Sequence, residues 1–127
     1  MLRQGLQRAR RRGIAVDAHV ADAMALPYAD GCFDTVVHVG AIQQFGDGKR
    51  EAIAEMLRVT RPGGQLLIVD ENLESRRKHT WWGRYLARLN PLFLDPPPID
   101  LVPEETRPEL SWILNGICFQ IVCRKPA

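Results

Sequence analysis

The sequence predicts an α/β fold with three parallel strands, a final antiparallel strand and helices packed on the faces of the sheet. Three short runs rich in β-branched and other apolar residues have the length of strands, and they occupy residues 14–21, 33–39 and 65–70. Helical periodicity fills the chain between the second and third runs. This strand–helix–strand order is typical of a right-handed parallel crossover. The apolar run at residues 117–123 predicts the antiparallel strand.

The first twelve residues predict an amphipathic helix. Leu2, Leu6 and Ala9 fall on one helical stripe, and Gly13 follows as a stop signal. The rest of the helix surface is basic, with Arg3, Arg8, Arg10, Arg11 and Arg12 and no acidic residue. We interpret it as a solvated basic face. A nucleic-acid contact is the weaker alternative, because no aromatic residues are interleaved with the arginines to stack on bases.

The middle of the chain predicts a second helix and a buried strand. Asp47 is a candidate N-cap, and apolar residues then recur at helical spacing from Ala52 to Val59. The sequence Arg-Pro-Gly-Gly at residues 61–64 stops the helix. The following run QLLIVD is continuously apolar up to Asp70, as expected for a strand that is buried on both faces.

Beyond Glu71 the pattern changes. Residues 74–94 predict a helix that carries an aromatic and aliphatic face surrounded by basic residues and ends at Asn90-Pro91. The apolar face consists of Trp81, Trp82, Tyr85, Leu86 and Leu89. A membrane-surface helix would have this pattern, but we favour a helix of the core or of a subunit contact. Residues 95–108 are rich in proline and predict an irregular surface segment.

The composition excludes several classes of protein. A chain of 127 residues with 46% hydrophobic and 25% charged residues is an ordinary globular domain rather than a disordered or fibrous chain. A net charge of +2 gives the whole molecule little attraction to polyanions. Cys32, Cys118 and Cys123 lack metal-ligand spacing, so we interpret them as reduced core thiols of a cytoplasmic protein. No apolar run has the length of a signal peptide or a membrane span.

Several short motifs occur together in a family-specific order. They are Asp22-Ala23, Leu26-Pro27-Tyr28, Phe33-Asp34, LRVTRPGG at residues 57–64, and the strand QLLIVD. In this order and at these intervals they resemble the middle of a class I S-adenosylmethionine-dependent methyltransferase of the small-molecule, type 11-like group. The resemblance implies a truncated Rossmann-like fold and an ancestral transfer of a methyl group to a small molecule. It divides a single domain, residues 1–127, into a family-like core (1–72), a variable lid or contact helix with a proline-rich segment (73–108), and a closing strand (109–127).

The resemblance also implies a partial cofactor site. Asp22 and Ala23 match the pair that contacts adenine, although Asp22 could equally cap the turn that follows it. His38, Val39 and Gly40 match the segment that lies along the methionine part of the cofactor, and Gln43 falls where many relatives have histidine. Methyl transfer depends mainly on proximity and orientation, so no catalytic base is assigned. No metal site is expected.

Two features of the family are missing. The resemblance begins at the helix after the family's second strand, so the glycine-rich loop and the acidic residue for the ribose hydroxyls are not found. The glycines around Asp47 do not replace the loop, because Arg50 stands where a phosphate-binding loop needs Ser or Thr. We therefore expect weak or no binding of S-adenosylmethionine by the lone chain. A non-catalytic binding or assembly module is the main alternative, and a nucleic-acid accessory protein that uses the basic helix is the weaker one.

The missing strands also predict a partner. In the family fold they separate the strand that ends at Asp22 from the strand that begins at Phe33, so their loss leaves unpaired edges and uncovered apolar faces. We expect a homodimer, since closed twofold symmetry is the commonest way to bury such a surface. A second chain that supplies the missing N-terminal half is the other candidate partner, and a small molecule is the expected acceptor.

Overall fold

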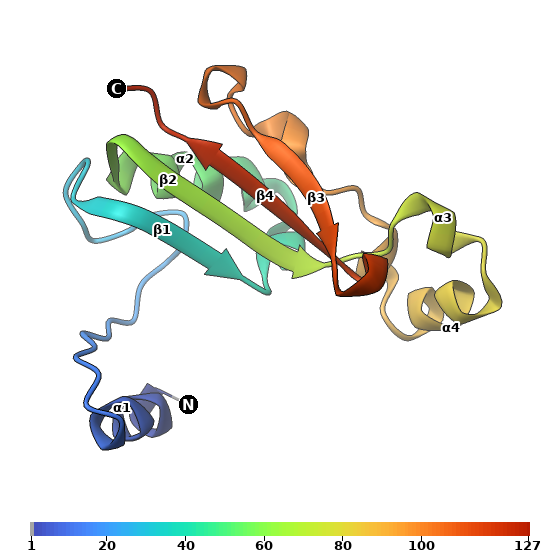
Figure 1. Ribbon diagram of the computed structural model, residues 1–127, viewed down its shortest axis with the longest axis horizontal. Helices are drawn as coiled ribbons and strands as arrows, with labels where there is room; N and C mark the ends of the chain where they lie inside the picture. The colour runs from blue at the N-terminus through green and yellow to red at the C-terminus, as the bar shows by residue number, and fades with distance from the viewer. Residues whose placement is uncertain (1) are drawn as a thin grey trace.

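A computed structural model describes residues 2–127, and its centre is a four-stranded mixed sheet with one long helix packed on one face (Figure 1). The strand order is β1-β2-β4-β3. The strands are β1 (Phe33–Val39), β2 (Thr60–Glu71), β3 (Glu109–Ile113) and β4 (Cys118–Arg124), and the long helix is α2 (Lys49–Val59). This arrangement confirms the predicted α/β class.

The predicted parallel crossover is present. β1 and β2 pair in parallel, with Val36 opposite Leu66 and Val39 opposite Val69, and α2 connects them. β4 pairs antiparallel with β2, as expected of the closing strand, and β3 pairs antiparallel with β4. Three strands therefore run in one direction and one in the other, as predicted. The third strand of that set, however, is β3 and not residues 14–21.

The prediction of a strand at residues 14–21 is wrong. This segment forms no ladder, and its apolar side chains lie in solvent, with Val20 88% exposed. A strand is stable only when a neighbour accepts its backbone hydrogen bonds, and the described residues provide none at this place. The helix before it, α1 (Leu2–Arg11), forms as predicted and turns at Gly13, whose φ is +67°. α1 buries no residue, and Met1 lies outside the described residues.

The start of α2 also differs from the prediction. A short 3-10 segment, η1 (Ile42–Gly48), runs through Asp47, so the helix begins at Lys49 with Gly48 in the capping position and without a side-chain cap. Its end is as predicted, and the Thr60 hydroxyl donates to the Met56 carbonyl at 2.6 Å. The Arg-Pro-Gly-Gly motif then forms the first part of β2.

The helix predicted over residues 74–94 is broken into two. α3 (Ser75–Lys78) ends in a turn, and α4 (Trp81–Leu89) restarts with Thr80 as its N-cap, whose hydroxyl accepts from the Gly83 amide at 2.9 Å. The helix stops at Asn90 as predicted, and 3-10 turns η2 (Pro91–Leu94), η3 (Pro98–Leu101) and η4 (Glu104–Thr106) occupy much of the irregular segment. Another, η5 (Leu114–Gly116), joins β3 to β4.

The hydrophobic core lies under one face of the sheet. Side chains of β2 and β4 on this face, including Leu66, Ile68, Phe119 and Ile121, are fully buried and belong to one cluster with Ile53 of α2. On the opposite face Val37 and Val39 remain 55% and 69% exposed, and Leu67 and Val69 are half-buried. Figure 1 shows that face toward the viewer with α2 behind the sheet. Within residues 2–127 the sheet is thus packed on one side only.

Two of the three cysteines differ from the prediction of core thiols. All three are free, but Cys123 alone is buried; Cys118 is half-buried and Cys32 is exposed. Cys32 lies in the loop before β1, which contributes little to the core. In residues 2–127, no helix combines the length and the apolar character needed to cross a bilayer.

Substitution of two adjacent leucines would test this one-sided core. Leu66→Ala removes a fully buried side chain, and we expect it to lower the free energy of unfolding by about 3 kcal/mol. Leu67→Ala removes the same atoms from the opposite face and should cost less than about half of that. Chemical denaturation at sub-micromolar chain concentration measures both. Equal costs at that concentration would contradict the one-sided packing.

Candidate functional site

The carboxyl ends of the parallel strands β1 and β2 form the candidate site, as ligands of open α/β sheets bind beyond such ends. β1 ends at Val39, and the φ of +67° at the next residue, Gly40, turns the chain away from the sheet. The Gly40 amide donates to the Val69 carbonyl of β2 at 2.9 Å, which keeps the two strand ends together. A Cβ added at Gly40 would meet nothing within 4 Å, so this backbone faces open space.

Asp70 joins the two strand ends more firmly. Its carboxylate accepts from the Gln43 amide at 3.0 Å and from the Glu71 amide at 2.8 Å. The side chain is buried, so these charge-assisted hydrogen bonds replace its lost hydration. Sequence reasoning did not single out Asp70. The available signal was an acidic residue at the end of the apolar run QLLIVD.

Gln43 is buried and held by its neighbours. Its Nε2 donates to the carbonyls of Asp95 and Pro96 at 3.4 and 3.3 Å, and Oε1 has no partner among the described residues. The side chain of Asn72 donates to the same Asp95 carbonyl. Gln43 therefore ties the proline-rich segment to the end of β1. This role was not foreseen, because it depends on contacts more than fifty residues away.

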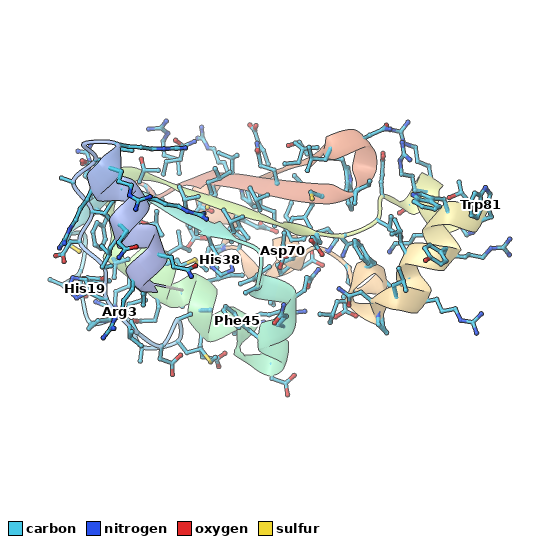
Figure 2. All side chains as sticks on the ribbon, turned by 90° about the horizontal axis from the view of Figure 1, so that it is seen from below. Arg3, His19, His38, Phe45, Asp70 and Trp81 are labelled. Atoms are coloured by element: carbon cyan, nitrogen blue, oxygen red, sulfur yellow. The ribbon has the colours of Figure 1, made fainter. Side chains whose placement is uncertain are left out.

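His38 points to the α2 side of the sheet, where its ring lies 5.6 Å from the ring of Phe45, and Figure 2 labels both residues and Asp70. Its Nε2 is buried without a partner among residues 2–127. Burial lowers the pKa of His38 below 6.5, and the charge of Asp70 offsets part of that shift. His38 is therefore neutral near pH 7. Val39 points to the opposite, uncovered face of the sheet.

Asp22 caps a turn, which was one of its two predicted roles. Its Oδ1 accepts from the Met24 amide at 2.9 Å, and its carbonyl accepts from the Ala25 amide at 3.1 Å. The side chain is exposed. Ala23, the next residue, lines a cavity of about 220 Å³ together with His38. The structure thus brings Ala23 and His38 to one cavity, while Val39 and Gly40 lie outside it.

An ion pair on α2 fixes the turn that follows Ala25. Arg58 donates to the carbonyls of Leu26 and Tyr28 at 3.0 and 2.8 Å, and Glu55 accepts from the Leu26 amide at 2.8 Å. Arg58 and Glu55 also bond to each other at 2.7 Å. These bonds to Arg58 and to the Leu26 amide lower the pKa of Glu55 from 4.5 to about 2. The sequence analysis used the motifs Leu26-Pro27-Tyr28 and LRVTRPGG as signs of the family. It did not predict that Arg58 of the second motif binds the first.

The turn should loosen when Arg58 is replaced. We expect Arg58→Gln to raise amide hydrogen exchange at residues 26–30 and to lower the thermal midpoint of unfolding. The matched control is Arg61→Gln, which breaks only the exposed pair between Arg61 and Asp34 and should have little effect.

The same variant should change the acid sensitivity of the chain. Because the pKa of Glu55 is lower in the folded state, its contribution to stability is present above pH 4.5 and is lost as the pH falls toward about 2. Arg58→Gln should reduce this dependence. Equal exchange rates and equal acid profiles in Arg58→Gln and Arg61→Gln would rule out a role of Arg58 in holding the turn.

The electrostatic environment of His38 gives a second test. A folded-state pKa below 6.5 means that the unfolded chain binds the proton more readily, so stability should decrease as the pH falls below that value. Asp70→Asn keeps one acceptor oxygen but removes the charge, and NMR titration should show a still lower pKa for His38. Asp34→Asn, at the start of the same strand, is the control. A higher pKa of His38 in Asp70→Asn would contradict the conclusion that the charge of Asp70 raises this pKa.

Within the described part of the chain, no group of three or more His, Cys, Asp or Glu side chains is arranged to hold a metal ion. The contacts at the strand ends are backbone groups, a buried amide and a carboxylate. Such a set can bind and orient a polar organic ligand by hydrogen bonds.

Comparison with known proteins identifies relatives of this chain by sequence. Human probable tRNA methyltransferase 9B is 41% identical over 73 residues, which are 56% of this chain and 16% of the relative. Demethylmenaquinone methyltransferase of Renibacterium salmoninarum is 43% identical over 61 residues, or 48% of this chain and 25% of the relative. The enzyme of that name from Thermus thermophilus is 39% identical over 70 residues, 55% and 31% of the two chains. The chain thus spans less than a third of these curated relatives.

Solved structures share the fold. A SAM-dependent methyltransferase from Methanosarcina mazei superposes with a TM-score of 0.65 at 18% identity, covering 98% of this chain and 76% of the other. One from Thermotoga maritima gives 0.62 at 21% identity, with 94% and 68% covered. The profile of the family described as "Methyltransferase domain" matches residues 1–68, which is more than half of the chain. The chain is therefore a member of the methyltransferase domain family, with the α/β fold of S-adenosylmethionine-dependent methyltransferases.

Proposed function

We propose that this chain takes part in S-adenosylmethionine-dependent methyl transfer to a small molecule, and that by itself it holds only part of the cofactor site. The observation that carries the proposal is the family match over residues 1–68, which contains both Asp22 and Gly40, the residue that follows the end of β1. S-Adenosylmethionine, when bound, would supply the sulfonium methyl group. The chain's own residues would hold and orient it, and the protein would work in the cytoplasm.

The geometry at Asp22 is compatible with an adenine contact. The turn uses one hydrogen bond to Oδ1, and an ionised carboxylate has acceptor sites for several. The second oxygen can therefore accept from an exocyclic amine while the turn stays intact. Ala23 would meet the adenine ring through its backbone.

The end of β1 would hold the methionine part of the cofactor. Gly40 leaves its backbone open to a ligand, and the exposed Val39 precedes it. The backbone of residues 38–40 would lie along this part of the cofactor. Gln43 would line the acceptor site, since its side chain holds the proline-rich segment next to the end of β1.

A second chain segment would complete the site. On its outer side β1 pairs with no other strand among residues 2–127, and Val37 and Val39 expose apolar surface beside that edge. Unpaired edges of this kind accept additional strands. We propose that strands carrying a glycine-rich loop add to this edge, with a second copy of the chain as the alternative occupant in a homodimer.

Titration calorimetry would test the proposal. We expect the lone chain to bind S-adenosylmethionine with a dissociation constant above the micromolar range. It makes only some of the family's contacts, and these poorly offset the entropy lost when the ligand and the chain are ordered. Adding the N-terminal segment of the Thermus thermophilus relative, cut where its match to this chain begins, should restore micromolar binding. In that mixture Asp22→Ala should weaken binding by about tenfold or more. Asp17→Ala, which removes another exposed carboxylate five residues earlier, is the control.

Two outcomes would contradict the proposal. Micromolar binding by the lone chain would show that its own contacts suffice. A mixture that assembles by light scattering but binds no cofactor would favour the non-catalytic assembly module. A dimer of the lone chain that persists in Trp81→Ala with Leu89→Ala would instead indicate a second copy at the β1 edge.

A further inference from the structure

α4 presents an apolar stripe to solvent, formed by Trp81, Trp82, Tyr85 and Leu89. Trp81 and Leu89 are 71% and 65% exposed. The rings are packed on one another, with Trp82 stacked on Tyr85 at 5.5 Å and Trp81 edge-on to Trp82 at 5.3 Å. The interpretation of this face as part of the core is therefore wrong. We call these four residues the aromatic stripe.

The aromatic stripe faces outward because of how α4 packs on its neighbour. Gly83 is buried against α3, where an added Cβ would lie 1.9 Å from the Arg77 carbonyl oxygen. Only a residue without a side chain fits this contact. The smallest residue of the helix thus faces the protein, and the largest apolar residues face solvent, opposite to the pattern of a core helix.

Arginines border the aromatic stripe. Arg84 and Arg88 are exposed on α4. They follow Trp81 and Tyr85 by three residues each, so they lie beside the stripe on the helix surface. Residues 75–89 contain five Lys and Arg and no Asp or Glu. Of the neighbouring cations, Arg76 is paired with Glu74 at 2.6 Å, while Lys78 donates to the Leu94 carbonyl at 3.3 Å. Arg84 and Arg88 have no such partner among the described residues.

The positive charge beside the aromatic stripe indicates what covers the stripe. A second copy placed on the aromatic stripe by twofold symmetry would bring Arg84 and Arg88 close to their own counterparts, and α4 has no acid to neutralise them. An anionic lipid surface offers the complementary charge. Tryptophan and tyrosine rings sit favourably at the level of the headgroups, and arginines beside them meet the lipid phosphates.

We propose that α4 docks the protein on the surface of an anionic lipid bilayer, with the aromatic stripe in the interface and Arg84 and Arg88 on the headgroups. The helix lies parallel to the surface and does not span it. α3 and α4 project beyond the end of the sheet to which β1 and β2 point (Figure 1). If the proposed function holds, docking brings the acceptor site to the membrane, where a lipid-soluble acceptor would be found.

Co-sedimentation with vesicles would test the docking and needs neither cofactor nor activity. The probe is the full chain with vesicles of phosphatidylcholine alone and of phosphatidylcholine with phosphatidylglycerol. We expect binding to the anionic vesicles, weaker binding at high salt, and little binding to the neutral vesicles. Arg84→Gln with Arg88→Gln should weaken binding by roughly tenfold or more. Trp81→Ala with Leu89→Ala should weaken it on the order of tenfold through lost apolar burial.

Matched controls lie at the other end of the molecule, where Figure 2 shows Arg3 and His19 far from Trp81. Arg8→Gln with Arg11→Gln removes the same charge from α1, and Ile14→Ala with Val20→Ala removes comparably exposed apolar groups. All eight side chains are exposed, so the variants should fold, and circular dichroism checks this. Both control pairs should bind within about twofold of the wild type.

Three results would overturn the proposal. One is equal loss of binding in the α1 and α4 charge variants, which would assign the attraction to net charge. Another is no binding to anionic vesicles. The third is a wild-type dimer that Trp81→Ala with Leu89→Ala converts to a monomer, since this would make a second copy the occupant. Cofactor binding by the completed site can fail without changing any of these results, so the two proposals are tested separately.

Discussion

Burial of α2 against one face of the sheet is the constraint on which the rest of this structure depends. The crossover through α2 sets β1 and β2 in parallel, so their carboxyl ends meet and Asp70 can reach the Gln43 amide. The C-terminal half of the same helix carries Arg58 and Glu55, which hold the turn after Ala25. The site is therefore built by groups that the core has already positioned.

The local spacing of apolar residues correctly predicted the strands that α2 packs on or connects. β1, α2, β2 and β4 have strong apolar patterns and form nearly as expected. Residues 14–21 have a comparable apolar pattern, but no strand of the described chain lies beside them. A local sequence pattern does not show whether a neighbouring strand is present. β3 was missed because its alternation covers only five residues after a proline-rich segment. The break before α4 was missed because the apolar pattern is periodic across it. The Thr80 side chain caps α4 there and starts a new helix.

The site was predicted in composition but not in geometry. The motifs identified Asp22, Ala23, His38, Val39, Gly40 and Gln43, while their contacts come from tertiary structure. Gln43 meets the carbonyls of Asp95 and Pro96 only after the proline-rich segment folds back. Arg58 shows how such contacts explain a motif, since one guanidinium in LRVTRPGG holds the Leu-Pro-Tyr turn thirty residues earlier.

The structure exposes two apolar surfaces whose chemistry differs. The uncovered sheet face presents aliphatic side chains such as Val37 and Val39 beside an unpaired strand edge, which provides backbone donors and acceptors in register. That combination suits another strand, because only a strand satisfies such an edge. The aromatic stripe has no free backbone groups along its helix but has amphipathic rings and arginines. Its requirement is an interface that is apolar on one side and anionic on the other, which a folded protein surface seldom offers over this length and a lipid headgroup layer offers throughout.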